Sequence, residues 1–502
     1  MESEALVKDE IRLHYSGFIV FASKLLSVVS GLAFQLMVAR GTTELEYDLF
    51  FNLRDILAYF TLLATALPFW TMRFVARNKE GAVSTGIFAN LAISTLAAAI
   101  YLPSVPFLTS VLGVRQEYLL LYFIVAIQIF ELYTINALQA CLQAKTPHAI
   151  GYGLLIAEVC KVGLGYLLIV EFRQPLMGAL VSLIFAYCLQ MAYYIRLLRI
   201  ELRQHLRTDY IKEWLKGSLA NIYNIVGNQM ANFVFILLFA YGGEGARGRY
   251  GLAAQVASIV AYSSFLSFAL YPKLLAARKK EDITASLKMV LLFAIPMATG
   301  AIALSDSYTV IMKSVYKDAS IVLAVLAIDA LVMTISGFFS SVLFGLERVD
   351  EAAGISFRTL VKSRLFIAFS LPYIHSLLTL PTTFYLLTNY AQNQPLQAAI
   401  SVSTLNLLAR SAMFVVLYSV VRRMIEINIP WKSIAKNVFA AAVMAIVLLL
   451  IPHPTKIHLT IAATAMGGVI YLGLSAAIDK ETRMLVNSVL QEIRSRFMNR
   501  KP

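Results

Sequence analysis

Long apolar runs separated by short polar segments make up almost the whole of this 502-residue chain. A helix needs roughly 20 apolar residues to cross the hydrocarbon core of a bilayer. Because lipid offers no hydrogen bonds, a crossing must be a helix or part of a closed barrel, and these runs lack the alternation of barrel strands. The pattern therefore predicts an all-α integral membrane protein with about fourteen transmembrane helices, at residues 17–39, 49–72, 83–104, 118–142, 148–170, 175–198, 216–240, 250–275, 284–304, 320–345, 360–388, 397–420, 434–452 and 457–478.

The polar segments carry a charge asymmetry that predicts the orientation of the chain. With both termini placed in the cytoplasm, 29 of the 43 Lys and Arg residues fall in cytoplasmic segments, 8 in outer segments and 6 within spans. This distribution follows the positive-inside rule from loop to loop, so we expect a multi-pass protein of the cell (plasma) membrane. Pro372 and Pro381 interrupt the eleventh run, where we expect a kinked or partly re-entrant segment.

Sequence similarity within the chain indicates two halves. The longest polar stretch between spans, about 196–215, separates six predicted helices from eight. Segment 47–53 (YDLFFNL) matches segment 250–256 (YGLAAQV), and the same offset of 203 residues aligns Lys145 with Arg348. An offset between even-numbered bundles predicts a parallel repeat. We expect a six-helix lobe at 1–199, a cytoplasmic linker at 200–215, a second six-helix lobe at 216–425, helices 13 and 14 within 426–480, and a basic cytoplasmic tail at 481–502.

Composition narrows the classes of function. The chain is 59% hydrophobic and 14% charged, whereas a soluble domain carries about 25% charged residues. Its net charge of +14 is explained by cytoplasmic loops, so we expect no nucleic-acid partner. The sequence contains no Gly-Lys pair, which excludes a Walker A loop. Its three cysteines lie in apolar runs, so neither a disulfide framework nor a metal or other cofactor is expected.

Three of the basic residues within predicted spans are candidates for a substrate cavity. A charge at the bilayer centre costs several kcal/mol, so it usually faces a partner or a watery cavity. Lys24 shares a helical face with Ser27, Gly31 and Gln35, and it either lines a cavity or extends to the cytoplasmic interface. Arg54 lies near the outer end of helix 2, and Arg410 lies in the middle of helix 12. A guanidinium group suits phosphate oxygens because it makes two-point contacts.

Acidic residues within the spans are candidates for charge partners or for coupling. Glu158 and Lys161 are three residues apart and can pair on one helix face. Asp55 follows the basic residue of helix 2 directly. Glu131 and Asp329 lie in helices 4 and 10, which are equivalent in the two predicted halves. Each either binds a coupling ion (Na⁺ or H⁺) or neutralises a buried base.

Helix 7 carries a stripe of asparagines. Four of them fall within about 80° of one another at helical pitch. Amides both donate and accept hydrogen bonds, which suits hydroxyl-rich sugars, but amides also bond helix to helix in membranes. The stripe consists of Asn221, Asn224, Asn228 and Asn232.

Two turns resemble those of Wzx-type polysaccharide flippases. Segment 38–41 (VARG) followed by 46–50 (EYDLF) is similar to that family's first loop, with Asp48 where a glycine is usual. Segment 344–348 (FGLER) resembles the turn after helix 10, with Glu347 departing from the pattern. The resemblance extends over the whole chain through helix count and half-length. It implies membership of the multidrug/oligosaccharidyl-lipid/polysaccharide (MOP) superfamily, with two lobes that alternate around a central cavity.

The implied activity is transport without covalent chemistry. A flippase of this type moves an oligosaccharide on a polyprenyl (di)phosphate from the cytoplasmic to the outer leaflet, for surface polysaccharide or glycan assembly. Its expected partners are the lipid-linked oligosaccharide, membrane lipids and a polysaccharide polymerase or glycosyltransferases. Two alternatives stay open: a cation-coupled multidrug exporter of the same superfamily, and an integral membrane glycosyltransferase. The exporter typically has twelve spans and an acidic first-lobe cavity, and the enzyme needs an acidic loop or soluble domain.

Overall fold

The computed structural model describes residues 26–27, 29–267, 280–346, 363–480 and 482–484. No β-strand occurs among these residues. Eleven helices are long and apolar enough to cross a membrane, or twelve if one bent pair counts as a single span. The predicted all-α membrane fold is thereby confirmed. The two other predicted spans, 17–39 and 250–275, extend into residues outside the described ranges.

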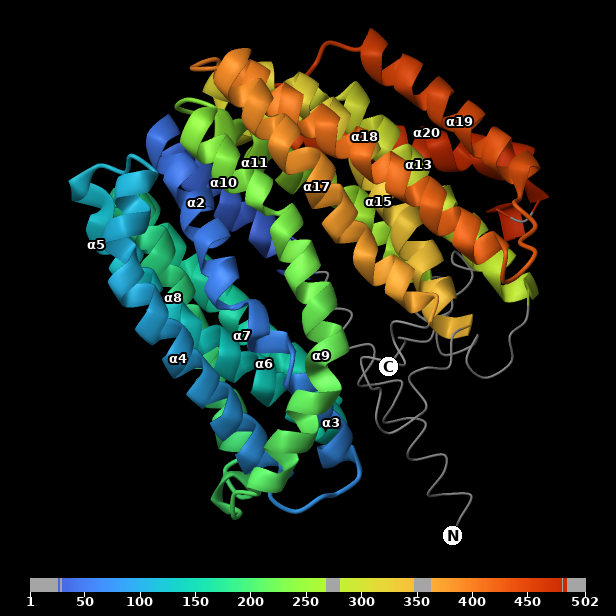
Figure 1. Cartoon of the computed structure of the whole chain (residues 1–502). Helices are drawn as coiled ribbons and strands as arrows, with labels where there is room; N and C mark the ends of the chain where they lie inside the picture. The colour runs from blue at the N-terminus through green and yellow to red at the C-terminus, as the bar shows by residue number, and fades with distance from the viewer. Residues whose placement is uncertain (1–25, 28, 268–279, 347–362, 481, 485–502) are drawn as a thin grey trace, which may run out of the picture. The chain divides into compact units, whose positions relative to one another are not determined.

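The helices follow the predicted runs in chain order (Figure 1). Residues 29–41 are helical. They precede α2 (Glu44–Phe60), η1 (Leu62–Thr65), α3 (Pro68–Ala76), α4 (Ala82–Val111), η2 (Gln116–Tyr118), α5 (Leu119–Val125), α6 (Ile127–Lys145), α7 (Pro147–Gly165), the π-helical η3 (Tyr166–Glu171), α8 (Pro175–Leu197), η4 (Glu201–Arg203), α9 (Thr208–Ala231) and α10 (Phe233–Tyr241).

The second part of the chain continues with a further series of helices. These are α11 (Ala246–Ala257), η5 (Ser258–Ser267), α13 (Lys280–Ala303), α14 (Ser305–Met312), η6 (Ser314–Ala319), α15 (Ser320–Leu346), α17 (Leu365–Asn389), α18 (Pro395–Arg422), α19 (Trp431–Leu450) and α20 (Ile457–Ile478). The appended α19 and α20 pack against each other and against α13.

Two predicted helices require correction. The run 49–72 is not one straight helix, because α2 and the segment Leu62–Ala76 meet at an angle of 60°. The bend lies at Thr61, where the α-helix ends and the 3₁₀-helix η1 begins, and Pro68 then opens α3. In contrast, α17 is one continuous helix that contains Pro372 and Pro381, so a re-entrant segment is wrong there.

Residue contacts group the chain into two compact units. Unit 1 contains the described residues up to Gly248 together with Phe369–Asn393, and unit 2 contains those from Arg249 to Leu346, 363–368 and those from Gln394 onward. Unit 1 thus includes α9, α10 and most of α17, which the repeat assigns to the second half. Packing in one conformation is a different property from sequence repetition, and the predicted domain boundaries stay a prediction.

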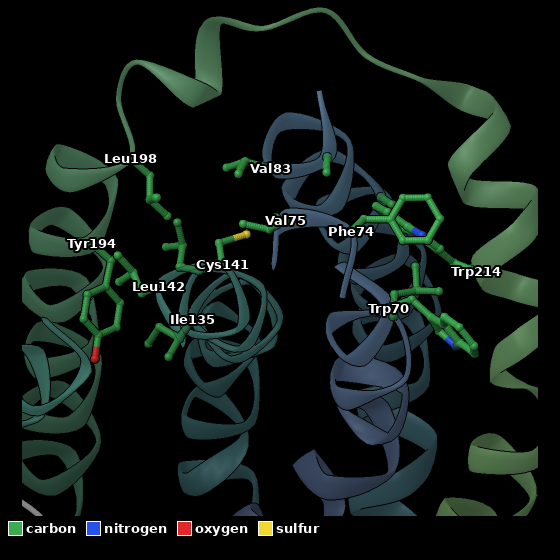
Figure 2. Packing of buried hydrophobic residues seen from close by; sticks show 14 of the residues in the cluster. Trp70, Phe74, Val75, Val83, Ile135, Cys141, Leu142, Tyr194, Leu198 and Trp214 are labelled. Atoms are coloured by element: carbon green, nitrogen blue, oxygen red, sulfur yellow. The ribbon is translucent and has the colours of Figure 1, made fainter. Parts of the chain in front are cut away.

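The predicted linker 200–215 is packed against unit 1. The side-chain oxygen of Gln204 accepts a hydrogen bond from the backbone of Gly81 (2.9 Å), and the backbone N–H of Arg207 donates to Thr85 Oγ1 (2.9 Å). Figure 2 shows the fully buried Trp214 beside Phe74 in a cluster of apolar side chains, where their ring centroids are 5.4 Å apart. These contacts attach the start of α9 to α3 and α4.

The repeated segments have matching environments. Tyr47 and Tyr250 are both buried near the starts of α2 and α11. The Tyr47 hydroxyl accepts a hydrogen bond from Gln35 (2.8 Å), and the Tyr250 hydroxyl accepts one from Asn406 (3.5 Å). The alignment at an offset of 203 residues therefore pairs positions with similar burial and similar hydrogen bonds.

Candidate functional site

The candidate cavity residue Lys24 lies outside the described residues, but Ser27, Gly31 and Gln35 on its predicted face are described. A Cβ atom at Gly31 would meet no atom within 4 Å. Ser27 Oγ donates to Glu158 Oε1 on α7 (2.8 Å), and Gln35 donates to Tyr47 on α2. Gln35 is only 4% exposed. At these two levels the polar face of the first helix contacts protein, so the cavity role of Lys24 stays a prediction.

Arg54 is an exposed cation within a membrane helix of unit 1. Helix α2 begins at Glu44, five residues earlier than predicted, so Arg54 lies about 15 Å along the helix from its start. Its side chain is exposed, and its guanidinium carbon lies 5.8 Å from the centre of the Phe50 ring. No carboxylate of the described residues lies within ion-pair distance of Arg54. An arginine at this depth without an acid is suited to binding an anion.

Asp55, the neighbouring acid, is bound by Arg247 instead. Arg247 Nε and a terminal guanidinium nitrogen contact the two oxygens of Asp55 at 2.6 and 2.9 Å. The guanidinium lies 4.8 Å from the ring centres of both Phe51 and Phe235. Sequence reasoning counted Arg247 as an outer loop charge, whereas it lies in the first turn of α11. This pair leaves Arg54 without Asp55 as a partner.

Asp48, which stands where the resembling family usually has a glycine, has a structural role near the start of α2. Its buried carboxylate accepts hydrogen bonds from the backbone N–H groups of Gly245 (2.6 Å) and Gly248. These groups lie at the start of α11, where backbone donors lack helical partners. An acid in place of the glycine found in the resembling family thus stabilises the beginning of α11.

The asparagine stripe lies on α9 and bonds mainly along its own helix. Asn228 donates to the backbone oxygen of Asn224 at 2.8 Å, and Asn232 donates to the side-chain oxygen of Gln229 at 3.4 Å. Asn228 and Asn232 are exposed, while Asn221 and Asn224 are half-buried. Bonds within one helix hold the amides in place without joining α9 to a neighbour.

A pair of stacked aromatic rings on another face of α9 was missed from the sequence. The rings of Tyr223 on α9 and Tyr373 on α17 stack with centres 4.6 Å apart. The Tyr373 hydroxyl donates to the backbone oxygen of Tyr223 (2.6 Å). A Cβ atom at Gly227 would lie 2.5 Å from the Tyr373 ring, so only glycine permits this approach. Gly227 was the signal in the sequence that could have indicated a close contact.

Glu158 and Lys161 form an ion pair on α7. Lys161 Nζ lies 2.6 Å from Glu158 Oε2, with both side chains largely buried. Ser27 and Ser30 of the first helix also donate to this carboxylate. The pair is therefore neutralised within the protein, as the spacing of three residues permits.

Glu131 on α6 has a different environment. It is 2% exposed, and its Oε1 accepts a hydrogen bond from the thiol of Cys188 on α8 (3.1 Å). Its second oxygen has no hydrogen-bond partner among the described residues. Glu131 therefore does not neutralise a buried base within the described part of the chain.

The remaining two candidates meet in unit 2. Arg410 on α18 forms an ion pair with Asp329 on α15, and the same nitrogen lies 3.7 Å from the sulfur of Met333. The Arg410 side chain is 29% exposed and that of Asp329 is 6% exposed. Arg410 thus has an internal counter-ion, and its charge is less available to a substrate than that of Arg54.

Solved structures of other proteins have a similar arrangement of helices. The chain has a TM-score of 0.65 with "Lipid II flippase MurJ, inward closed conformation", at 15% identity, covering 93% of this chain and all of the other. For an inward-facing multidrug resistance MATE transporter of the MOP superfamily, the TM-score is 0.60 at 14% identity, covering 79% and 95% of the two chains. The outward-facing form gives 0.55 at 14%, covering 82% and 95%. This chain has the MOP superfamily fold.

Sequence comparisons add no closer relationship. No family model matches the chain, and no curated protein matches it. At 14–15% identity the likeness shows the MOP fold alone, and the proteins that share it here are a flippase and transporters. Function must therefore be argued from the residues of this chain.

Proposed function

We propose that this protein is a flippase for a polyprenyl (di)phosphate-linked oligosaccharide. It moves this carrier from the cytoplasmic to the outer leaflet of the plasma membrane by alternating access. The observation that carries the proposal is Arg54, an exposed arginine within a membrane helix that has no acidic partner among the described residues. A phosphate group would neutralise this charge through two-point hydrogen bonds.

The acids of unit 1 favour an anionic substrate over a cationic drug. Asp55 is bound by Arg247, and Glu158 is bound by Lys161. Glu131 is buried. None of these three carboxylates is available to an organic cation in this conformation, whereas the cation at Arg54 is exposed. This distribution supports the flippase over the multidrug exporter.

Saccharide recognition in the proposal falls to α9. The exposed amides of Asn228 and Asn232 present both donors and acceptors,. Tyr223 on another face of α9 stacks on Tyr373 of α17 and packs these two helices together,. The head group would bind to these polar positions while the polyprenyl tail stays in lipid, so the cycle breaks no covalent bond. Both termini would lie in the cytoplasm.

The test is a leaflet-transfer assay in proteoliposomes with a fluorescent, chemically defined undecaprenyl diphosphate-linked sugar. We expect Arg54→Ala to lower the transfer rate at least about tenfold, because a hydrogen bond to a charged group contributes about 1.5–3 kcal/mol. Arg54→Lys should retain an intermediate rate, since a point charge replaces the guanidinium fork. Arg115→Ala is the matched control, because Arg115 is exposed and lies next to Glu117 (3.7 Å).

The outcomes separate the candidate functions. If the unmodified protein transfers the carrier and Arg54→Ala transfers it at the same rate, Arg54 is not part of the site. No transfer, together with efflux of a lipophilic cation, would instead support the multidrug exporter. Sugar transfer from a nucleotide donor would support the glycosyltransferase. Lys24→Ala belongs in the same series as a test of the sequence prediction. Coupling to Na⁺ or H⁺ and association with a polymerase or glycosyltransferases are further parts of the proposal.

A further inference from the structure

A cavity of about 250 Å³ lies at one end of unit 1. It is bounded by the start of α2, the residues that follow α4, the end of α10 with its following loop, and the end of α17 with its following turn. All these segments fall on the side that the charge pattern predicts to be outer. The candidate residues from the sequence analysis do not line this cavity.

The loop after α10 has a well-defined backbone conformation where it lines the cavity. Gly243 and Gly245 have φ angles of 84° and 87°, in the left-handed region that glycine adopts without strain. Between them Glu244 lines the cavity with an exposed side chain. Asp48, 3% exposed, accepts hydrogen bonds from the backbone of Gly245 and Gly248. The loop is therefore fixed to α2 by a buried carboxylate.

The end of α17 and the turn that follows it also line the cavity. Thr388, Gln392 and Asn393 line it, and Asn393 adopts a left-handed backbone with φ of 56°. The neighbouring ring of Tyr241 packs edge-on against Phe384, with centres 5.3 Å apart and planes at 90°. An aromatic ring held in one orientation thus lies among amide, hydroxyl and carboxylate groups.

We propose that this cavity binds a single sugar ring. Planar amides can donate to and accept from neighbouring hydroxyl groups, and a carboxylate can accept from them. The fixed Tyr241 ring offers an apolar surface to the C–H face of a pyranose. No lysine or arginine is among the residues that line the cavity, so a phosphate or sugar acid is disfavoured. The volume is just below the roughly 300–1,000 Å³ of sites for drug-sized ligands, which suits one ring.

This sugar site is distinct from the phosphate site at Arg54. Asp48 and Arg54 are six residues apart on α2, which corresponds to about 9 Å along the axis and a rotation of about 240°. The two side chains therefore lie on different faces of the helix. The inference rests on the proposed function only for its source of ligand, which is either a sugar of the lipid-linked carrier or a free oligosaccharide.

The first experiment measures binding without transport. Saturation-transfer NMR is recorded on the purified full-length protein in detergent with glucose, galactose, mannose and N-acetylglucosamine, each tested alone. We expect at least one sugar to bind, and the double variant Glu244→Gln/Gln392→Ala to weaken its binding at least about fivefold, because two hydrogen-bonding groups are altered. Glu117→Gln/Gln116→Ala is the matched control on another outer segment that does not line the cavity.

The results distinguish this site from the proposed function. Equal binding by the double variant and the unmodified protein overturns the sugar site, as does the absence of binding by all four sugars. Arg54→Ala should bind the sugar normally even where it no longer transfers the carrier. If the double variant also slows leaflet transfer, the ligand is the carrier's own sugar. Unchanged transfer with weakened binding identifies a free oligosaccharide as the ligand.

Discussion

Arg54 on α2 and Arg410 on α18 are both arginines within membrane helices, yet their surroundings differ. Arg54 is exposed, lies near the Phe50 ring and has no acidic partner among the described residues. Arg410 is part-buried and bound to Asp329 on the adjacent α15. The same residue type is therefore available to a ligand in unit 1 and internally neutralised in unit 2. The availability of the charge, rather than its presence in a span, indicates function.

The buried acids show the complementary difference. Asp329 has Arg410 as its partner, whereas Glu131 has a thiol and one oxygen without a partner among the described residues. Arg54 and Glu131 thus have no charged partner among the described residues, whereas Arg410 and Asp329 pair with each other. This contrast predicts that substitution of Arg54 mainly changes activity, while substitutions of the Arg410–Asp329 pair mainly change stability.

The largest expected effect comes from giving Arg54 the kind of partner that Arg410 has. Ala58 lies one turn after Arg54 on α2 and is half-buried, so Ala58→Glu would place a carboxylate within reach of the guanidinium. We expect leaflet transfer to fall at least about tenfold, because the new acid competes with phosphate for a charge-assisted bond of about 1.5–3 kcal/mol. Ala58→Gln has the same size without the charge and should transfer normally. Equal loss in both variants would point to a steric effect and would remove support for anion binding.

The next effect tests the pair in unit 2 by a double-mutant cycle. Arg410→Met leaves the buried Asp329 without its counter-ion, and removing one partner of a buried pair costs about 3–5 kcal/mol. We expect a clear loss of thermal stability in detergent for Arg410→Met, and recovery of most of it in Arg410→Met/Asp329→Asn. Arg54→Met, measured alongside, should change stability by less than about 1 kcal/mol.

The cycle would contradict the comparison in two ways. A stability loss for Arg54→Met as large as that for Arg410→Met would show that Arg54 also has a strong internal partner. Additive losses in the double variant would show that Arg410 and Asp329 do not stabilise each other, since coupled neighbours deviate from additivity.

Glu131→Gln should have a smaller effect on stability. The amide has nearly the shape of the carboxyl group, and no cation among the described residues would lose a partner. We expect thermal stability to change by less than about 1 kcal/mol, and Cys188→Ala to behave similarly because a thiol is a weak donor. A loss comparable to that of Asp329→Asn would mean that Glu131 does neutralise a base.

The sequence was sufficient for much of the fold because lipid imposes a length and a polarity on each helix. The predicted run 457–478 coincides with α20, and 175–198 differs from α8 by one residue. The bend after α2 was missed because hydropathy does not register the change from α-helix to 3₁₀-helix at Thr61 within a continuous apolar run. The continuous α17 shows the converse, since two prolines did not end a helix.

Charge pairing was predictable only where the partners are close in sequence. The spacing of Glu158 and Lys161 indicated their pair, which α7 brings together by its own pitch. The pairs of Asp55 with Arg247 and of Asp329 with Arg410 join residues 192 and 81 positions apart. Such pairs depend on how helices pack, which periodicity does not specify. The same reason explains why the availability of Arg54 emerged only from the structure.

The smallest expected effect on stability concerns an ion pair outside the predicted spans. Lys145 at the end of α6 binds Glu201 in η4. Burial raises the pKa of Glu201, but the hydrogen bond and charge of Lys145 and a backbone hydrogen bond outweigh it, so its pKa lies below the usual 4.5. A lowered folded-state pKa means that the pair stabilises the fold above pH 4.5 and loses this contribution as pH falls through the folded pKa. Glu201→Gln should therefore cost less than about 1 kcal/mol at pH 7, and the difference from the unmodified protein should shrink in acid. Thermal unfolding at pH 7 and at a pH below the folded pKa of Glu201 checks this prediction. If the stability difference between Glu201→Gln and the unmodified protein grew in acid, the lowered pKa of Glu201 would be contradicted.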